Sequence, residues 1–106
     1  MTEVIQVWMK APGAEPEQKF IQNSLEFMQW YVGGYIEAFT LTSDMVIICN
    51  EEGKLDGLRY NCTIAGENFV GNIIIVGTDG ENFADCPADE KRMRYLFPNL
   101  WENEGN

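Results

Sequence analysis

The sequence has no histidine, and this absence removes the side chain on which many hydrolytic and metal-dependent sites rely. Without an imidazole, neither a Ser-His-Asp nor a Cys-His catalytic pair can form. The two serines, Ser24 and Ser43, lie in no Gly-x-Ser-x-Gly elbow, and no Gly-x-x-x-x-Gly-Lys phosphate loop occurs. We therefore expect a binding protein without cofactor, metal or catalytic residues. An enzyme that uses carboxylates or a cysteine is the less favoured alternative.

Basic side chains are also scarce, since 7 lysines and arginines stand against 17 aspartates and glutamates, for a net charge of −10. Nucleic-acid affinity depends on basic groups that displace counterions, so direct binding to nucleic acid is not expected. An acidic surface instead attracts a protein with a basic surface, such as a nuclease or a defence complex. The competing interpretation is that the acidity serves only solubility.

Cysteine and long apolar segments are few as well. The three cysteines, Cys49, Cys62 and Cys86, are an odd number with no close pair, which indicates neither a disulfide framework nor a zinc knuckle. Cys49 ends an apolar run and should be buried, whereas Cys86 is expected to be more exposed, near a helix N-terminus. The longest apolar runs, at residues 45–49 and 73–76, are too short to span a membrane. A cytoplasmic location is therefore expected, with no membrane partner.

What is present is a hydrophobic pattern typical of one α+β domain over residues 1–97. It predicts a small, mostly antiparallel sheet of about four to six strands, with one helix after the first hairpin and one C-terminal helix. Strands are predicted at residues 4–9, 19–21, 35–41, 45–49 and 69–76, and helices at residues 24–32 and about 86–97. Asn23 is expected to cap the first helix, and Gly33-Gly34 to end it. Residues 55–62 are expected to be irregular or weakly extended, residues 78–82 to form a loop, and residues 98–106 to form an acidic tail.

The densest charged cluster in the interior of the chain lies in a predicted turn, where Glu51 and Glu52 stand beside Lys54. One interpretation is a solvated hairpin tip with Gly53 at the required backbone geometry. The other is a binding site, in which Asn50 and Asn61 add polar contacts. If they bind a ligand, their replacement by alanine should abolish binding without lowering the melting temperature.

Two further groups of residues have competing interpretations. Asp79, Glu81 and Asp85 do not have the spacing of a calcium loop and are interpreted as a plain acidic loop. Trp30 and Tyr31, near the end of the first helix, belong either to the core or to an interaction face, and the core is favoured.

Four segments resemble a known family: VGGYIEA at residues 32–38, CNEEGKL at residues 49–55, Gly57-Leu58 with Asn61, and IVG at residues 75–77. Over about residues 4–97 the chain resembles the domain of unknown function 3846 family, which is similar in length and in the order of its elements. That family occurs in phages, plasmids, conjugative elements and bacterial genomes. The resemblance implies an accessory protein of mobile DNA in a bacterial cell, and it brings no reaction or ligand.

The candidate ligand- or partner-binding residues come from the charged cluster and these segments. They are Gly33, Gly34, Tyr35, Asn50, Glu51, Glu52, Gly53, Lys54 and Asn61. The leading hypothesis is a non-enzymatic inhibitor or modulator of a host factor, directed against CRISPR or another nucleic-acid-directed defence. The alternative is a small-molecule or nucleotide-signal binding protein, a sponge or sensor. Exposed strand edges and surplus aromatic residues are compatible with a homodimer.

Overall fold

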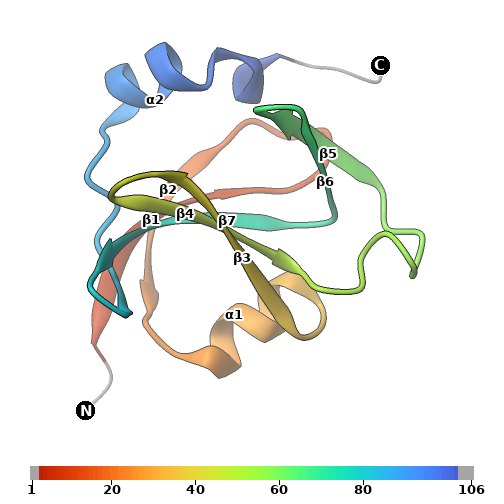
Figure 1. Ribbon diagram of the computed structural model, residues 1–106, viewed down its shortest axis with the longest axis horizontal. Coiled ribbons are helices and arrows are strands. Elements are labelled where there is room, and N and C mark those ends of the chain that lie inside the picture. The colour runs from red at the N-terminus through yellow and green to blue at the C-terminus, as the bar shows by residue number, and fades with distance from the viewer. Residues whose placement is uncertain (1–2, 103–106) are drawn as a thin grey trace.

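An antiparallel six-stranded sheet forms the centre of the computed structural model, which describes residues 3–102 (Figure 1). Its strands are β1 (Val4–Lys10), β2 (Glu17–Gln22), β3 (Ile36–Thr42), β4 (Met45–Asn50), β7 (Ile73–Asp79) and β8 (Asn82–Ala84). They lie in the order β2-β1-β7-β4-β3, and β8 pairs with the end of β7. A separate antiparallel hairpin consists of β5 (Tyr60–Ile64) and β6 (Glu67–Val70). The strands confirm the predicted α+β class with a mostly antiparallel sheet.

Both faces of the sheet are covered, as Figure 1 shows. One face packs against α1 (Leu25–Val32), and the other against α2 (Glu90–Leu96), the 3-10 helix η1 (Pro98–Trp101) and the β5–β6 hairpin. Because successive strand side chains point to opposite faces, β7 places Ile73 and Ile75 in one core and Ile74 and Val76 in the other. Neither α-helix in the described part of the chain has the length and apolar character needed to cross a membrane.

The N-termini of both α-helices differ from the predicted positions, because other side chains cap them. Asn23 is not the cap of α1; Ser24 is, because its hydroxyl accepts a hydrogen bond from the Phe27 N–H at 3.2 Å. Gly33 ends α1 in the left-handed conformation, as predicted. The second helix starts at Glu90 rather than near Cys86, because the Asp89 side chain caps it.

One predicted strand is wrong, and two observed strands were not predicted as such. The predicted strand at residues 69–76 is two strands, because the backbone of Gly71 has a φ of 71° and the chain passes there from the hairpin into the main sheet. Strand β8 forms after a predicted loop, and β5 forms where the pattern indicated only an irregular or weakly extended segment. Their pairing with β6 and β7 supplies the order that their own sequences do not indicate.

The predicted acidic tail is wrong for its first residues. Pro98–Trp101 form η1, in which Leu100 is only 1% exposed, and the Trp101 ring meets the Trp8 ring edge-on at 5.7 Å between centroids. This segment therefore belongs to the core. Residues 103–106 of the predicted tail lie outside the described residues.

Candidate functional site

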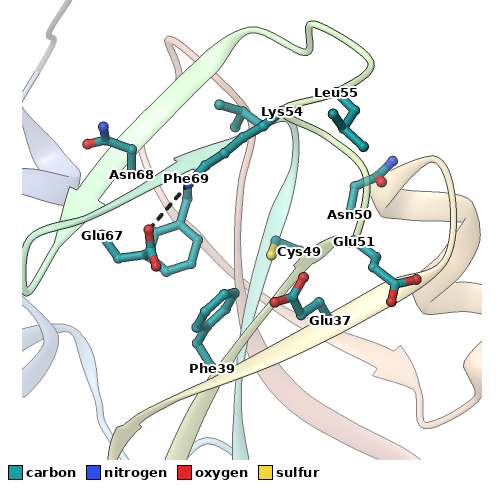
Figure 2. Close-up of a pocket in the computed structure, with 11 residues that line it drawn as sticks. Glu37, Phe39, Cys49, Asn50, Glu51, Lys54, Leu55, Glu67, Asn68 and Phe69 are labelled. Carbon is teal, nitrogen blue, oxygen red and sulfur yellow. Dashed lines mark hydrogen bonds and ion pairs between the residues drawn. The ribbon is translucent and has the colours of Figure 1, made fainter.

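A pocket of about 140 Å³ opens between β3 and β6, beside the predicted charged turn (Figure 2). Its lining comes from four parts of the fold and comprises Glu37, Phe39, Cys49, Asn50, Glu51, Lys54, Leu55, Glu67, Asn68, Phe69 and Val70. Glu37 and Phe39 share one face of β3 because strand side chains alternate. The hairpin brings β6 over that face, and we call this cavity the β3–β6 pocket.

The β3–β6 pocket has an apolar floor and an acidic rim. At the floor, the rings of Phe39 and Phe69 meet edge-on with centroids 5.5 Å apart, next to the buried Cys49. The charged lining residues are three carboxylates, Glu37, Glu51 and Glu67, and one lysine, Lys54. The Lys54 ammonium lies 3.3 Å from the Glu67 carboxylate (Figure 2). Two carboxylates at the rim therefore have no ion-pair partner among the described residues.

A second hollow, of about 320 Å³, lies on the other side of Asn50. We call it the Tyr35 hollow; its lining is Gln29, Gly34, Tyr35, Asn50, Glu52 and Asp56. Its charged lining residues are both acidic, so within the described chain this hollow offers no cation to an anionic ligand. Residues 50–56 thus separate two neighbouring hollows that are both anionic.

Asn50 joins these hollows, yet its amide is used inside the fold. Its Nδ2 donates to the carbonyl of Val32 at 3.2 Å, and its Oδ1 accepts from the N–H of Glu52 at 2.8 Å. A side chain on Gly34 would come within 2.9 Å of Nδ2, so this close approach requires glycine. The Gly33-Gly34 segment and Asn50 therefore fasten the end of α1 to β4 and to the turn that follows.

Asn61 lies away from both hollows. A β-bulge between Tyr60 and Cys62 leaves Asn61 out of the strand pairing, and its side chain turns inward. There Nδ2 donates to the carbonyls of Lys10, at 2.9 Å, and Gly71, at 2.7 Å. Its Oδ1 accepts from the ammonium of Lys10 at 2.8 Å, and Lys10 is only 5% exposed. This buried network holds the hairpin on the main sheet.

The structure thus divides the predicted site residues into three groups. Asn50, Glu51 and Lys54 line the β3–β6 pocket, and Gly34, Tyr35, Asn50 and Glu52 line the Tyr35 hollow. Gly53 is buried under the turn, beside Val70 and Leu58. Like Gly53, Gly33 and Asn61 line neither cavity, and these three residues form the third group.

Several lining residues lay outside the predicted set. Glu37 and Phe39 were detectable, because period-2 alternation places them on one face of a predicted strand. Glu67 and Phe69 carried no such signal, because their position depends on the fold of the hairpin over the sheet. Lys10 is likewise buried only because the same hairpin covers the end of β1.

The thiols of Cys49 and Cys86 are poorly suited to nucleophilic chemistry. Burial raises the pKa of Cys49 to about 11, and the nearby carboxylate of Glu37 adds to the increase. Cys86 is buried, not exposed as predicted, because its segment runs along β1, where its N–H donates to the carbonyl of Gln6 at 2.7 Å. Burial raises the pKa of the Cys86 thiol too. A thiol with a raised pKa stays protonated, and therefore unreactive, near neutral pH.

The two aromatic candidates near the end of α1 differ in burial. Trp30 is 73% exposed, so its predicted core position is wrong, and its ring contacts Phe27 at 5.6 Å between centroids. Tyr31 is partly buried and packs against the core that α1 covers. Within residues 3–102, no group of three acidic or cysteine side chains is placed to hold a metal ion.

The comparisons with known proteins give a family and nothing more specific. No curated protein and no solved structure matches the chain. Residues 5–97 match the family model described as "Domain of unknown function (DUF3846)". Since this match covers most of the 106 residues, the chain belongs to the DUF3846 family, as its sequence segments indicated.

Proposed function

We propose that the protein is a non-enzymatic binding protein that engages a basic surface of another protein and thereby inhibits or modulates it. The observation that carries this proposal is the charge of the two hollows. Among residues 3–102, five carboxylates line them against a single lysine, and that lysine is already paired with Glu67. Such a surface accelerates and orients association with a cationic partner.

The geometry gives less support to a nucleotide-signal sponge. Pockets for drug-sized ligands usually measure about 300–1,000 Å³. The β3–β6 pocket, at about 140 Å³, is smaller than that. The Tyr35 hollow is larger, but Glu52 and Asp56 would repel a phosphate group. The amides of Asn50 and Asn61, which were the expected polar contacts, are already hydrogen-bonded within the fold.

Basic side chains gather elsewhere on the molecule. Helix α2 carries Lys91, Arg92 and Arg94. Arg94 donates to Glu90 at 2.8 Å, and Arg92 lies 4.0 Å from Asp44. The carboxylates that these two arginines contact line neither hollow. The mobile-element setting implied by the family resemblance makes a bacterial nuclease or another nucleic-acid-directed defence protein our candidate partner, since such proteins have basic channels.

Native mass spectrometry of the tagged protein recovered from a bacterial lysate tests the proposal. We expect a co-purifying basic protein that dissociates at about 0.5 M sodium chloride, because salt screens exposed charges. Reversal of the rim charges with Glu37→Lys, Glu51→Lys and Glu67→Lys should remove it. The matched control is Glu15→Lys, Glu26→Lys and Glu81→Lys, which changes the net charge equally at exposed positions outside both hollows.

Two results would contradict the proposal. A bound mass below about 1 kDa without a protein partner would favour the small-molecule alternative. Equal retention of the partner by the rim variant and the wild type would show that the acidic hollows are not the binding surface.

A further inference from the structure

We propose that the partner docks on the edge of β3: an extended basic segment pairs with β3 as an additional strand, and one of its cationic side chains enters the β3–β6 pocket. This inference rests on the proposed function and specifies the chemistry of the partner. Strand addition to an open sheet edge is a general mode of peptide recognition, in which main-chain hydrogen bonds give affinity and pockets for alternate side chains give specificity.

The outer edge of β3 is open. In the part of the chain that the structure describes, β3 pairs with β4 alone and ends the strand order of the main sheet (Figure 1). An edge strand presents unpaired N–H and C=O groups to the solvent. On the face that α1 partly covers, Ala38 and Thr40 are exposed and small, so an incoming strand meets little steric hindrance there.

The two edges of the sheet differ in their protection against strand addition. At the opposite edge, β2 carries the exposed Lys19, which forms an ion pair with Glu17 at 3.4 Å. Lysine on an edge strand is a common means of preventing pairing with another chain. The β3 sequence, IEAFTLT, contains no lysine or proline and consists mostly of residues that favour strands. Pairing with β4 becomes irregular only at its end, between Thr40 and Thr42.

The β3–β6 pocket supplies a place for one side chain of the added strand. Side chains of a strand alternate between the two faces of a sheet, so every second side chain of an added strand would point to the same face as Glu37 and Phe39. Neighbouring strands lie about 4.8 Å apart, which brings these side chains close to the pocket. A lysine or arginine there would lay its methylene groups on Phe39 and bring its charge to Glu37 and Glu51. The volume of about 140 Å³ matches a single side chain rather than a larger group.

Charge complementarity favours a basic segment over a second copy of this chain. A second copy would place its own β3, with its own Glu37, against an acidic rim, and each chain has a net charge of −10. Like charges on adjacent strands are destabilising, whereas opposite charges stabilise the pair. We therefore assign the edge to a cationic extended segment, and the second copy becomes an outcome of the test.

The probe is a short peptide of alternating lysine and valine, added to the full chain labelled with ¹⁵N. We expect the amide resonances of residues 36–42 to shift and their hydrogen exchange to slow. Two N-methylated versions of the peptide serve as controls. Each version lacks the N–H groups of one set of alternate residues, and the N–H groups of one set all point to the same edge of an extended strand. One version should lose affinity by roughly tenfold or more, and the other should retain it, since only one edge pairs with β3. A glutamate-valine peptide should not bind.

Variants of the protein separate the pocket from general charge. Glu37→Gln combined with Glu51→Gln should weaken peptide binding several-fold, whereas Glu26→Gln combined with Glu81→Gln should leave it nearly unchanged.

If both N-methylated peptides bind like the parent, or if the resonance shifts lie outside β3, the edge proposal fails while the charge-based function stands. The edge proposal also fails if the protein alone sediments as a dimer and its β3 amides are protected from hydrogen exchange before peptide is added. In that case a second copy of the chain already pairs with β3. If neither this peptide nor a basic lysate protein binds, the proposed function itself fails.

Discussion

Asn61 shows how one backbone irregularity decides the role of a polar side chain. In its sequence, an asparagine close to glycines is equally compatible with a ligand contact and with a structural role. The bulge in β5 turns its side chain toward the buried ammonium of Lys10 and the carbonyl of Gly71. A buried ammonium requires acceptors, because leaving the charge without them costs several kcal/mol. We therefore assign Asn61 to the stability of the fold.

Asn61→Ala tests this role. The substitution removes an acceptor from Lys10 and a donor from two buried carbonyls, so we expect the free energy of unfolding to fall by about 2–4 kcal/mol. Urea unfolding followed by circular dichroism measures the change. The matched control is Asn82→Ala, at an exposed position, which should change stability by less than about 0.5 kcal/mol. If both variants unfold at the same urea concentration, Asn61 is not structural and its assignment as a ligand contact regains support.

At the level of elements, η1 illustrates that a short C-terminal segment can complete a core. Its Leu100 packs in the cluster that also contains Trp8, Met93 and Phe97. The residues around it, with Pro98 before and acidic residues after, are typical of a chain end that leaves the fold. Only the apolar Leu100 and Trp101 indicated otherwise, and two residues are too short a pattern to establish a period.

Paired leucine substitutions test the contribution of η1. Leu100→Ala removes a side chain that is 1% exposed and leaves a cavity, so we expect a loss of about 2–5 kcal/mol. Leu55→Ala removes the same atoms from a side chain that is 86% exposed and should change stability by less than about 0.5 kcal/mol. Thermal unfolding of both variants gives the comparison. Equal melting temperatures for the two would mean that η1 adds nothing to the core.

The elements that sequence could predict are those whose signal is local. β1, β4 and α1 each carry their own pattern, such as the apolar run that ends at Cys49 or the glycine that ends the helix. The division of residues 67–79 into β6 and β7 is different, because it depends on the backbone of Gly71 and on the partners that each half finds. The same reason limits the site: its turn was predictable, whereas the β6 wall of the pocket was not.

At the scale of the whole molecule, charge is unevenly distributed. The two hollows around residues 50–56 are acidic, while three of the seven basic residues lie on α2, which covers the sheet face that also carries the β5–β6 hairpin. Exposed ion pairs such as that of Lys54 with Glu67 contribute little to stability, typically about 0–1 kcal/mol. The excess of seventeen acidic over seven basic residues therefore acts mainly as long-range repulsion.

This repulsion predicts that added salt stabilises the protein. The compact state holds like charges closer together than the unfolded chain does, and ions screen them, with a Debye length of about 30 Å at 0.01 M and about 8 Å at 0.15 M. A gain of about 1 kcal/mol would raise the melting temperature by roughly 4–8 °C for a domain of this size. Thermal unfolding across that range of sodium chloride concentrations measures the rise. Each glutamate-to-lysine reversal replaces a negative charge with a positive one and so changes the net charge by +2. The triple variants therefore carry −4 in place of −10 and should gain less from salt. Both triple variants should respond alike, since the repulsion is global. If the melting temperature of the wild type does not change with salt, the repulsion hypothesis is wrong. If only one triple variant loses part of the response to salt, the repulsion comes from a single site.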